Sequence, residues 1–193
     1  MYEDLRLVFD QIIKVPQKEW QIFEGIVTNI EVEKSEFLLR EGQFCKGIYF
    51  LSRGALRTFH TFDSREVNTS FHFEREFLRE IESLTFDTPS KKNIQAIESS
   101  SVLLIEKPKL TKLYKESEYF LRLGNLILER LTINEQKYSS LLATYSPRER
   151  YSQLINNQPE ILQRVPLQHI ASYLGISRES LSRIRKRLSS SAF

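Results

Sequence analysis

The side chains best suited to recognising a ligand lie between positions 177 and 187. They are Ser177, Arg178, Glu179, Ser182, Arg183, Arg185, Lys186 and Arg187. An arginine can donate two hydrogen bonds to O6 and N7 of guanine, and a glutamate can accept one from N4 of cytosine. The cluster from Arg185 to Arg187 suits phosphates, which attract positive charge without reading sequence. These residue types indicate binding to double-stranded DNA.

The residues around this cluster predict the elements that hold it. Apolar residues at 167, 170, 171 and 174 form a compact helical face, and Gly175 permits a left-handed turn. Ser177 can then cap a second helix, on which Leu181, Ile184 and Leu188 point one way. Helix, glycine turn and helix is the helix-turn-helix arrangement, whose second helix enters the major groove. The alternative is a solvated amphipathic helix whose charges bind nothing specific.

The distribution of charge along the chain favours the first interpretation. Residues 144–193 hold eight basic and three acidic residues, a net charge of +5. The other 143 residues hold 20 basic and 22 acidic residues, a net charge of −2. Such an asymmetry suggests a polyanionic partner at one end of the chain. RNA-binding modules need aromatic residues on an exposed sheet or a signature loop, and we recognise neither.

The composition predicts an ordinary globular protein of the cytoplasm. The 193 residues include 40% hydrophobic and 27% charged residues, and no long apolar run or apolar leader is visible. We therefore expect no membrane partner. The single Cys45 excludes an internal disulfide and a multi-cysteine cluster, and a reducing compartment follows. Cys45 itself is either a redox switch or a small residue in a turn, and we favour the turn.

Residue patterns for catalysis or cofactor binding are not recognisable. The sequence has no P-loop, nucleophile elbow, HExxH or dinucleotide fingerprint. His60, His72 and His169 are too dispersed to suggest a metal site. Glu80 and Glu82 could form an acid and base pair, but charged loop residues explain them equally well. We expect no catalytic residue, no metal and no cofactor, hence no enzyme.

The region from 26 to 107 has the short apolar runs of a β-sandwich or barrel-like roll. Strands are expected at 36–40, 47–52, 55–61, 67–73, 93–99 and 101–107. A short helix is expected at 76–84, and one or two more within 1–25. The fold class is thus α+β. Ser146 and Pro147 then start a helix expected at 148–156, because serine is a good N-cap and proline is tolerated at the first position.

A long helix is expected between the roll and the C-terminal helices. One face of it repeats at alternating spacings of four and three: Phe120, Gly124, Ile127, Leu131, Asn134, Tyr138 and Leu141. This spacing favours a seam between two copies, with Leu123, Leu126 and Ile133 covering the roll. The alternative is that the first face packs on its own roll. We expect units at 1–117 (roll and flanking helices), 118–143 (connecting and dimerisation helix) and 144–193 (helix-turn-helix).

These features together resemble the CRP/FNR family of bacterial transcription regulators. The resemblance rests on the order of elements and on IASYLGISRESLSRIRK, and the ending LSRIRK is similar to a group common in Bacteroidetes. The stretch REGQFCKGIYFLSRGALR, from 40 to 57, resembles the cyclic-nucleotide-binding-type domain, a double-stranded β-helix. By this resemblance Arg178, Glu179 and Arg183 correspond to base-reading positions.

The resemblance also implies a ligand loop at FLREIESLTFDTPSKKNIQA, residues 77–96. Cyclic-AMP binders of the family start this loop with Gly-Glu-Leu and end it with Arg-Ser. Here Glu80 takes the ribose position, Arg79 replaces the glycine, and Ser90 and Lys91 replace Arg-Ser. Lys91 or Lys92 could offer a point charge to another anion, but not the two parallel bonds of an arginine. The open alternatives are another small ligand or none, with cyclic AMP disfavoured.

The expected function is DNA-binding transcription regulation by a homodimer on a pseudo-palindromic operator. The resemblance implies RNA polymerase as a further partner, and the effector stays unidentified. The rival hypothesis is a ligand-binding signalling module whose C-terminal helices bind a protein partner.

Overall fold

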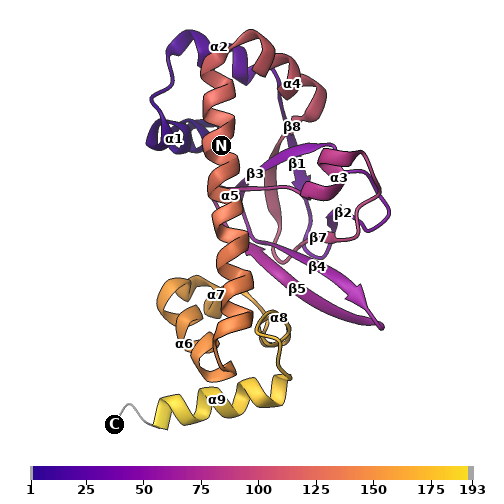
Figure 1. The fold of residues 1–193 in the computed structure, drawn as a ribbon, viewed down its shortest axis with the longest axis vertical. Helices are drawn as coiled ribbons and strands as arrows, with labels where there is room; N and C mark the ends of the chain where they lie inside the picture. The colour runs from indigo at the N-terminus through magenta and orange to yellow at the C-terminus, as the bar shows by residue number, and fades with distance from the viewer. Residues whose placement is uncertain (1, 191–193) are drawn as a thin grey trace.

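The computed structural model describes residues 2–190 and contains eight antiparallel strands in two sheets (Figure 1). The strands are β1 (Val27–Val32), β2 (Phe37–Leu39), β3 (Gly47–Arg53), β4 (Leu56–Phe62), β5 (Arg65–His72), β6 (Glu76–Leu78), β7 (Asn93–Ala96) and β8 (Ser100–Glu106). One sheet has the order β1-β8-β3-β6, and the other has the order β2-β7-β4-β5. Together they form the β-roll.

The interior of the roll is packed with apolar side chains from both sheets. Successive side chains of a strand point to opposite faces, so Tyr49 and Leu51 enter the interior while Ile48 and Phe50 face outward. Leu56 of β4 and Ile94 of β7 meet the inward pair from the second sheet, and both are fully buried. The turn between β3 and β4 needs Gly54, because its φ is +97° and a Cβ there would lie 2.3 Å from the Ser100 hydroxyl.

Nine helices are described in residues 2–190, and all except the third, which lies within the roll between β6 and β7, form or link two groups beside the roll. They are α1 (Tyr2–Ile12), α2 (Gln17–Glu24), α3 (Ile81–Phe86), α4 (Lys107–Glu116), α5 (Glu118–Thr144), α6 (Pro147–Asn157), α7 (Pro159–Arg164), α8 (Leu167–Tyr173) and α9 (Arg178–Ser190). The long α5 runs past the roll and links the two groups (Figure 1).

The upper group consists of α1, α2, α4 and the first part of α5. It packs on the outward face of the β1-β8-β3-β6 sheet. Phe9 of α1 stacks on Phe77 at a ring distance of 5.9 Å, and Phe23 of α2 stacks on Phe120 of α5 at 5.4 Å. Phe50 of β3 completes this cluster and is fully buried. Since aromatic side chains bury large areas, these contacts fasten α5 to the roll.

The lower group, α6 to α9, shares a second apolar cluster with the roll. Tyr151, Leu154, Ile161 and Leu181 are buried in it, and the roll contributes residues such as Phe71. Across the described part of the chain, no helix combines the length and apolar character needed to cross a membrane.

The expected α+β architecture of a roll, a long helix and further helices is confirmed. The helix expected at 76–84 is wrong in its first part, which is strand β6. Phe77 pairs there with Phe50 of β3, and the helix begins only at Ile81. Strand β1 and helix α7 were not expected. Half of β1 is solvent-exposed, so its alternation of apolar and polar residues is weak.

Candidate nucleic-acid interface

The turn between α8 and α9 is closed by hydrogen bonds at the end of α8. The Gly175 N–H donates to the Ser172 carbonyl and the Ile176 N–H donates to the Ala171 carbonyl, each at 3.0 Å. Gly175 has a φ of +68°, the left-handed conformation that such a C-terminal motif requires. Ser177 then caps α9, because its hydroxyl accepts from the Ser180 N–H at 3.2 Å. The predicted helix, turn and helix are all present.

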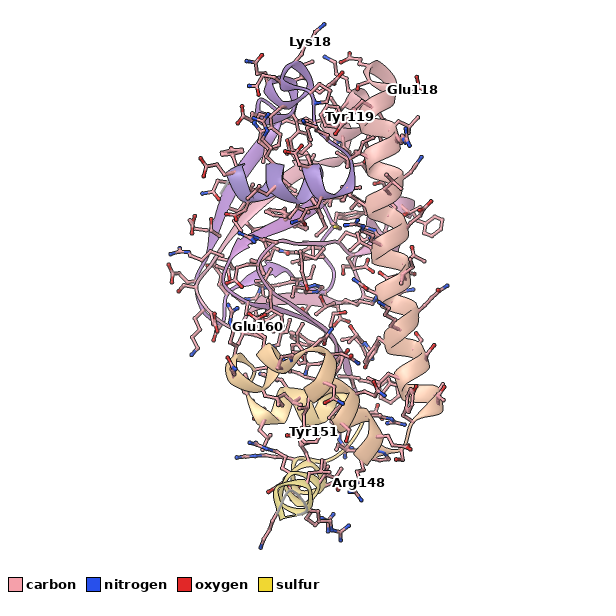
Figure 2. The ribbon with its side chains drawn as sticks, turned by 90° about the vertical axis from the view of Figure 1, so that its left-hand side faces the viewer. Lys18, Glu118, Tyr119, Arg148, Tyr151 and Glu160 are labelled. Atoms are coloured by element: carbon pink, nitrogen blue, oxygen red, sulfur yellow. The ribbon has the colours of Figure 1, made fainter. Side chains whose placement is uncertain are left out.

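Helix α9 has one buried face and one exposed face. Leu181 is fully buried, and Ile184 and Leu188 pack on the same cluster. The eight predicted DNA-binding residues are all exposed: Ser177, Arg178, Glu179, Ser182, Arg183, Arg185, Lys186 and Arg187. The helix lies at the end of the molecule away from the roll in both views (Figures 1 and 2). Its polar face is therefore open to a large partner.

Two polar side chains near the start of α9 have defined local environments. Hydrogen bonds from its own backbone N–H and from Ser177 lower the pKa of Glu179 below its usual value, so this carboxylate is an acceptor at neutral pH. Arg183 donates from Nη2 to the Ser180 hydroxyl at 3.1 Å. An acceptor and a cation thus stand side by side at the end of the helix that reads bases in helix-turn-helix proteins.

Arg150 of α6 ties the turn to the end of α5. Its guanidinium donates to the carbonyls of Leu142 at 2.7 Å, Tyr145 at 2.8 Å and Leu174 at 2.9 Å. The last carbonyls of a helix lack partners within the helix, so one arginine here completes the ends of both α5 and α8. Ser146 and Glu149 form a reciprocal capping box at the start of α6. The orientation of α9 is thereby coupled to α5.

The carboxylate of Glu80, a predicted ligand residue, already makes contacts within its own loop. Glu80 is 2% exposed, and its carboxylate caps α3 by accepting from the Ser83 N–H at 2.7 Å. The Ser83 hydroxyl in turn accepts from the Cys45 N–H at 2.9 Å. The Lys92 ammonium lies 3.9 Å from the other carboxylate oxygen. The structure thus brings Glu80 and Lys92 close together, with the carboxylate engaged by α3.

The other predicted ligand residues also bond locally. Ser90 is 3% exposed, and its hydroxyl donates to the Lys92 carbonyl at 2.7 Å and accepts from the Lys92 N–H at 3.1 Å. Its backbone bonds to Gly42 and Gln43 in the neighbouring turn. Lys91 is exposed and pairs with Glu82. A ligand role for these residues stays a prediction.

Cys45 and the histidines occupy separate environments. Burial raises the pKa of the Cys45 thiol, which is 6% exposed and donates to the Gly47 carbonyl at 3.3 Å, so the reactive thiolate is disfavoured. His72 contacts Thr58 and His169 contacts Arg57. Within residues 2–190, no group of three or more metal-ligating side chains has the geometry to hold a metal ion.

The predicted dimer seam on α5 faces the chain's own body, which corrects the preferred hypothesis. Phe120 and Ile127 are buried in the upper cluster, and Leu131 packs against it. Tyr114 of α4 lies against Gly124 and leaves no room for a side chain there, because a Cβ would come within 2.2 Å of the tyrosine hydroxyl. Lower on the helix, the Tyr138 hydroxyl donates to the carbonyl of Asn68 at 3.0 Å.

The remaining residues of this face, and those of the neighbouring stripe on α5, differ in how far they are buried against the body of the chain. Leu141 packs on the lower cluster, and Asn134 is the one exposed residue of the seven. In the stripe expected to cover the roll, Leu123 does so, whereas Ile133 is 50% exposed.

Two arginines that join the helix-turn-helix unit to the roll were not singled out from the sequence. Arg57 of β4 is 4% exposed and contacts His169 of α8. Arg164 at the end of α7 bonds Glu74 and Glu98 of the roll. Their partners are as far as 112 positions away along the chain, so no local pattern could have indicated them.

Comparison with known proteins agrees with this architecture. Residues 29–117 match the family model of the cyclic nucleotide-binding domain. The transcriptional activator protein Anr of Pseudomonas protegens is 28% identical over 169 residues, which cover 81% of this chain and 68% of that protein. Its counterpart in Pseudomonas aeruginosa is 26% identical over 170 residues with the same coverage.

Solved structures share the fold over most of the chain. FixK2 from Bradyrhizobium japonicum has a TM-score of 0.70 at 20% identity and covers 86% of each chain. The c-di-GMP responsive global regulator CLP of Xanthomonas campestris has a TM-score of 0.72 at 18% identity, covering 92% of this chain and 93% of that chain. A regulator from Eubacterium rectale, assigned to the CRP/FNR family, has a TM-score of 0.70 at 15% identity and covers 92% and 85%.

The fold and the relatives define a class of protein in which a cyclic nucleotide-binding domain is joined by a long helix to a helix-turn-helix unit. The relatives are transcription regulators and not enzymes, and they support the prediction of a DNA-binding regulator. Residues 29–117 thus match the cyclic nucleotide-binding domain, and the chain as a whole is similar to transcriptional activators and to a regulator assigned to the CRP/FNR family. Its resemblance to the Bacteroidetes group stays a prediction.

Proposed function

We propose that two copies of the chain read a pseudo-palindromic operator, each inserting α9 into the major groove. In this proposal residues 1–117 form a regulatory roll, 118–143 connect and dimerise, and 144–193 read DNA. RNA polymerase is the partner that the bound dimer would contact. The observation that carries the proposal is the exposed basic face of α9, held by the Gly175 turn on a buried apolar face.

The dimer contact is proposed on α5, one residue further along than the predicted seam. The positions Leu121, Asn125, Leu128 and Thr132 keep the alternating spacing of four and three. Leu121 is 43% exposed and Leu128 is partly exposed, and neither packs on the upper cluster. The two apolar members, Leu121 and Leu128, are one heptad apart, a spacing that favours helix pairing, so this stripe is the surface on which a second copy would lie.

A pair of matched substitutions tests this surface. Leu128→Asp places a carboxylate in the proposed helix pair, so sedimentation should show a shift toward monomer. Ile133→Asp is the control, because this exposed residue lies about 140° around the helix from Leu128. It should leave the dimer intact. A dimer that survives Leu128→Asp and dissociates with Ile133→Asp would place the contact on the other side of α5.

The DNA proposal is tested by selecting bound sequences from a pool of random duplexes. The expected product is a pseudo-palindrome whose half-sites are about 34 to 36 Å apart, one helical turn. Binding should weaken linearly in log affinity against log salt, because phosphate contacts release counterions.

The rival hypothesis predicts a different outcome of the same experiment. A signalling module whose C-terminal helices bind a protein would enrich no sequence and would show no salt-dependent affinity for DNA. The exposed face of α9 carries five arginine or lysine residues, at positions 178, 183, 185, 186 and 187, and one glutamate, which favours a polyanion over a mixed protein surface.

Control by a small ligand other than cyclic AMP is a further part of the proposal. Cyclic AMP is disfavoured because Glu80 caps α3 and because Ser90 and Lys91 replace the Arg-Ser pair, so the two parallel bonds of an arginine are missing. Calorimetric titration with cyclic AMP at micromolar concentration should give no binding heat. A clear isotherm that Glu80→Ala abolishes would instead establish a cyclic-nucleotide sensor.

A further inference from the structure

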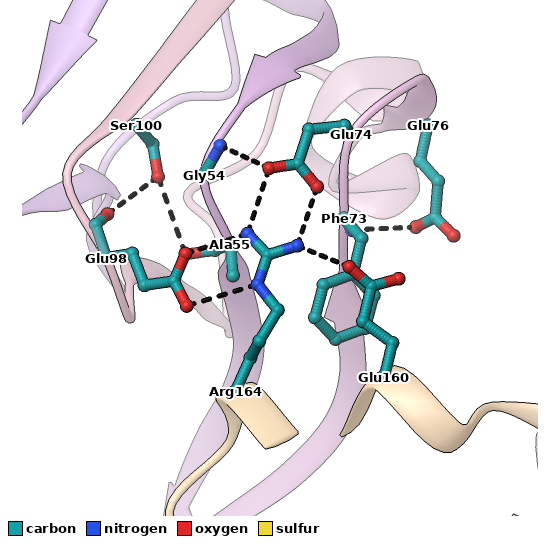
Figure 3. A network of polar contacts seen from close by, with 9 residues as sticks. All are labelled: Gly54, Ala55, Phe73, Glu74, Glu76, Glu98, Ser100, Glu160 and Arg164. Carbon is teal, nitrogen blue, oxygen red and sulfur yellow. Dashed lines mark hydrogen bonds and ion pairs between the residues drawn. The ribbon is translucent and has the colours of Figure 1, made fainter. Parts of the chain in front are cut away.

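The helix-turn-helix unit is fastened to the roll by polar contacts that do not involve α5. The strongest centre on Arg164, at the end of α7 (Figure 3). Its guanidinium reaches Glu74, which follows β5, with bonds of 2.7 and 2.9 Å. It also reaches Glu98, which follows β7, with bonds of 3.1 and 2.7 Å. Both pairs are bidentate, the geometry in which arginine gives the greatest directional specificity.

The surroundings of Arg164 hold this geometry in place. Glu74 also accepts from the Gly54 N–H at 2.8 Å, so its carboxylate is fixed to the roll independently. The guanidinium lies 5.1 Å from the ring centre of Phe73 and also pairs with Glu160 of its own helix. Hydrogen bonding from Arg164 lowers the pKa of Glu74 to about 2, so the pair is fully ionised at neutral pH.

A second polar cluster joins α8 to the β4–β5 hairpin. Arg57 donates to Glu66 at 2.6 Å and to Nδ1 of His169 at 3.1 Å. The His169 nitrogen must accept this bond, so the ring is neutral. Ser172 donates to the Glu66 carbonyl at 2.7 Å and accepts from the Asn68 N–H at 3.0 Å. Helix α8 is therefore bonded to both strands of the hairpin.

Apolar side chains pack between the Arg164 contacts and the Arg57 contacts. Tyr173 of α8 lies 5.2 Å from the ring of Phe71, and Ala55 and Ile97 of the roll belong to the same buried cluster. A buried apolar contact, with the bidentate pairs of Arg164 on one side and the Arg57 cluster on the other, resists rotation of one part against the other.

The docked arrangement does not cover the surface proposed to bind DNA. The contacts use α7 and α8, whereas the polar face of α9 is exposed on the far side (Figure 2). A contact that leaves the reading surface open directs it without blocking it. We infer that Arg164 is a positioning residue which, by tying α7 to two loops of the roll, sets the direction and separation of the two recognition helices.

This inference rests on the proposed function, and it predicts which property of DNA binding Arg164 controls. Each base pair inserted between half-sites moves one of them by about 3.4 Å and rotates it by about 34°. A rigidly held unit tolerates one spacing, whereas a released unit tolerates several. Arg164 should thus govern the preferred spacing, while α9 governs the preferred bases.

The test compares half-site spacings selected from random duplex DNA by wild-type protein and by three variants. The wild type should select one dominant spacing. Arg164→Gln should select the same half-site over neighbouring spacings, so the affinity ratio between the best spacer and one longer by a base pair falls toward unity. Glu98→Gln, which removes one partner across the contact, should give an intermediate spread.

Glu160→Gln is the matched control, since it removes a partner within α7 and leaves both pairs across the contact. It should reproduce the wild-type spacing. Circular dichroism of each variant checks folding, and Glu98→Gln serves if Arg164→Gln fails to fold. A folded Arg164→Gln protein with the wild-type spacing would overturn the inference, and so would one that binds the best site more tightly. If the wild type selects no sequence, the proposed function fails and the inference fails with it.

Discussion

The loop from Glu80 to Lys92 and helix α9 both concentrate charged and hydroxyl side chains, but they use them in opposite ways. In the loop, Glu80 caps α3 and the Ser90 hydroxyl bonds the backbone of Lys92. On α9, the polar side chains from Arg178 to Arg187 lie on an exposed face backed by a buried Leu181. The loop uses its polar groups to hold its own conformation, and the helix presents them outward.

Buried and exposed polar clusters therefore differ in how readily they can bind a ligand. One oxygen of the buried Glu80 carboxylate accepts from the Ser83 N–H and the other faces Lys92, so a change at Glu80 that removes the cap would leave a buried N–H without its partner. An exposed arginine can turn toward a base edge or phosphate without leaving a buried polar group unpaired. The contacts of Glu80 and Ser90 support the loop's own conformation, whereas the polar face of α9 is exposed, which is consistent with the proposal that α9 binds DNA.

The largest effect is expected on α9. Arg183→Ala should weaken binding to the selected operator by about 1 to 3 kcal/mol, or about 5- to 150-fold, and relax preference at one base pair. Affinity should be measured on the operator and on scrambled DNA. An equal loss on both would mean that this arginine holds phosphate and that the first turns of α9 do not read bases.

A smaller effect is expected in the loop, and on a different property. Glu80→Ala should lower the free energy of unfolding by about 1 kcal/mol, because the α3 cap is lost. Urea denaturation measures this change, and operator affinity should stay at the wild-type value. Glu82→Ala is the control, since Glu82 lies on the same helix but pairs only with exposed Lys91. Normal stability of Glu80→Ala would contradict the structural role.

Lys186→Ala should distinguish phosphate binding from base reading on α9. We expect all sequences to be bound more weakly by the same factor. The slope of log affinity against log salt should fall by about 1 for each phosphate that the protein no longer neutralises, or about 2 for a symmetric dimer. A salt titration on the operator and on scrambled DNA gives both quantities. A weakening confined to the operator would assign Lys186 to base recognition instead.

The smallest effect is expected from Lys91→Ala. Its ion pair with Glu82 is exposed, so the free energy of unfolding should change by less than about 0.5 kcal/mol. Thermal and urea unfolding would both detect a larger change. Such a change would mean that Lys91 stabilises the fold although its side chain is exposed.

Local sequence patterns predicted the turn and helix α9 well, because the signals that define them are local. Gly175, Ser177 and the apolar spacing of Leu181, Ile184 and Leu188 act within a few residues of one another. The strands β2, β3, β4, β5, β7 and β8 were also predicted, since each lies in a short run rich in apolar and β-branched residues.

The orientation of α5 could not be predicted in the same way. Two adjacent stripes, beginning at Phe120 and Leu121, share the spacing of four and three, so periodicity alone cannot say which one is buried. Phe9 and Phe23 decide it, because they pack on the first stripe from α1 and α2. The Arg164 contacts could not be predicted from the sequence either, because Glu74 is 90 positions away along the chain.

The stacking of Phe23 on Phe120 has a consequence for how the chain is made. The two residues are 97 positions apart, so at a synthesis rate of about 5 to 20 residues per second Phe120 follows Phe23 by about 5 to 20 s. During that interval α1 and α2 have no α5 to cover their apolar sides. A nascent chain that stalls before residue 120 would therefore carry an uncovered aromatic surface, the kind of surface that chaperones bind.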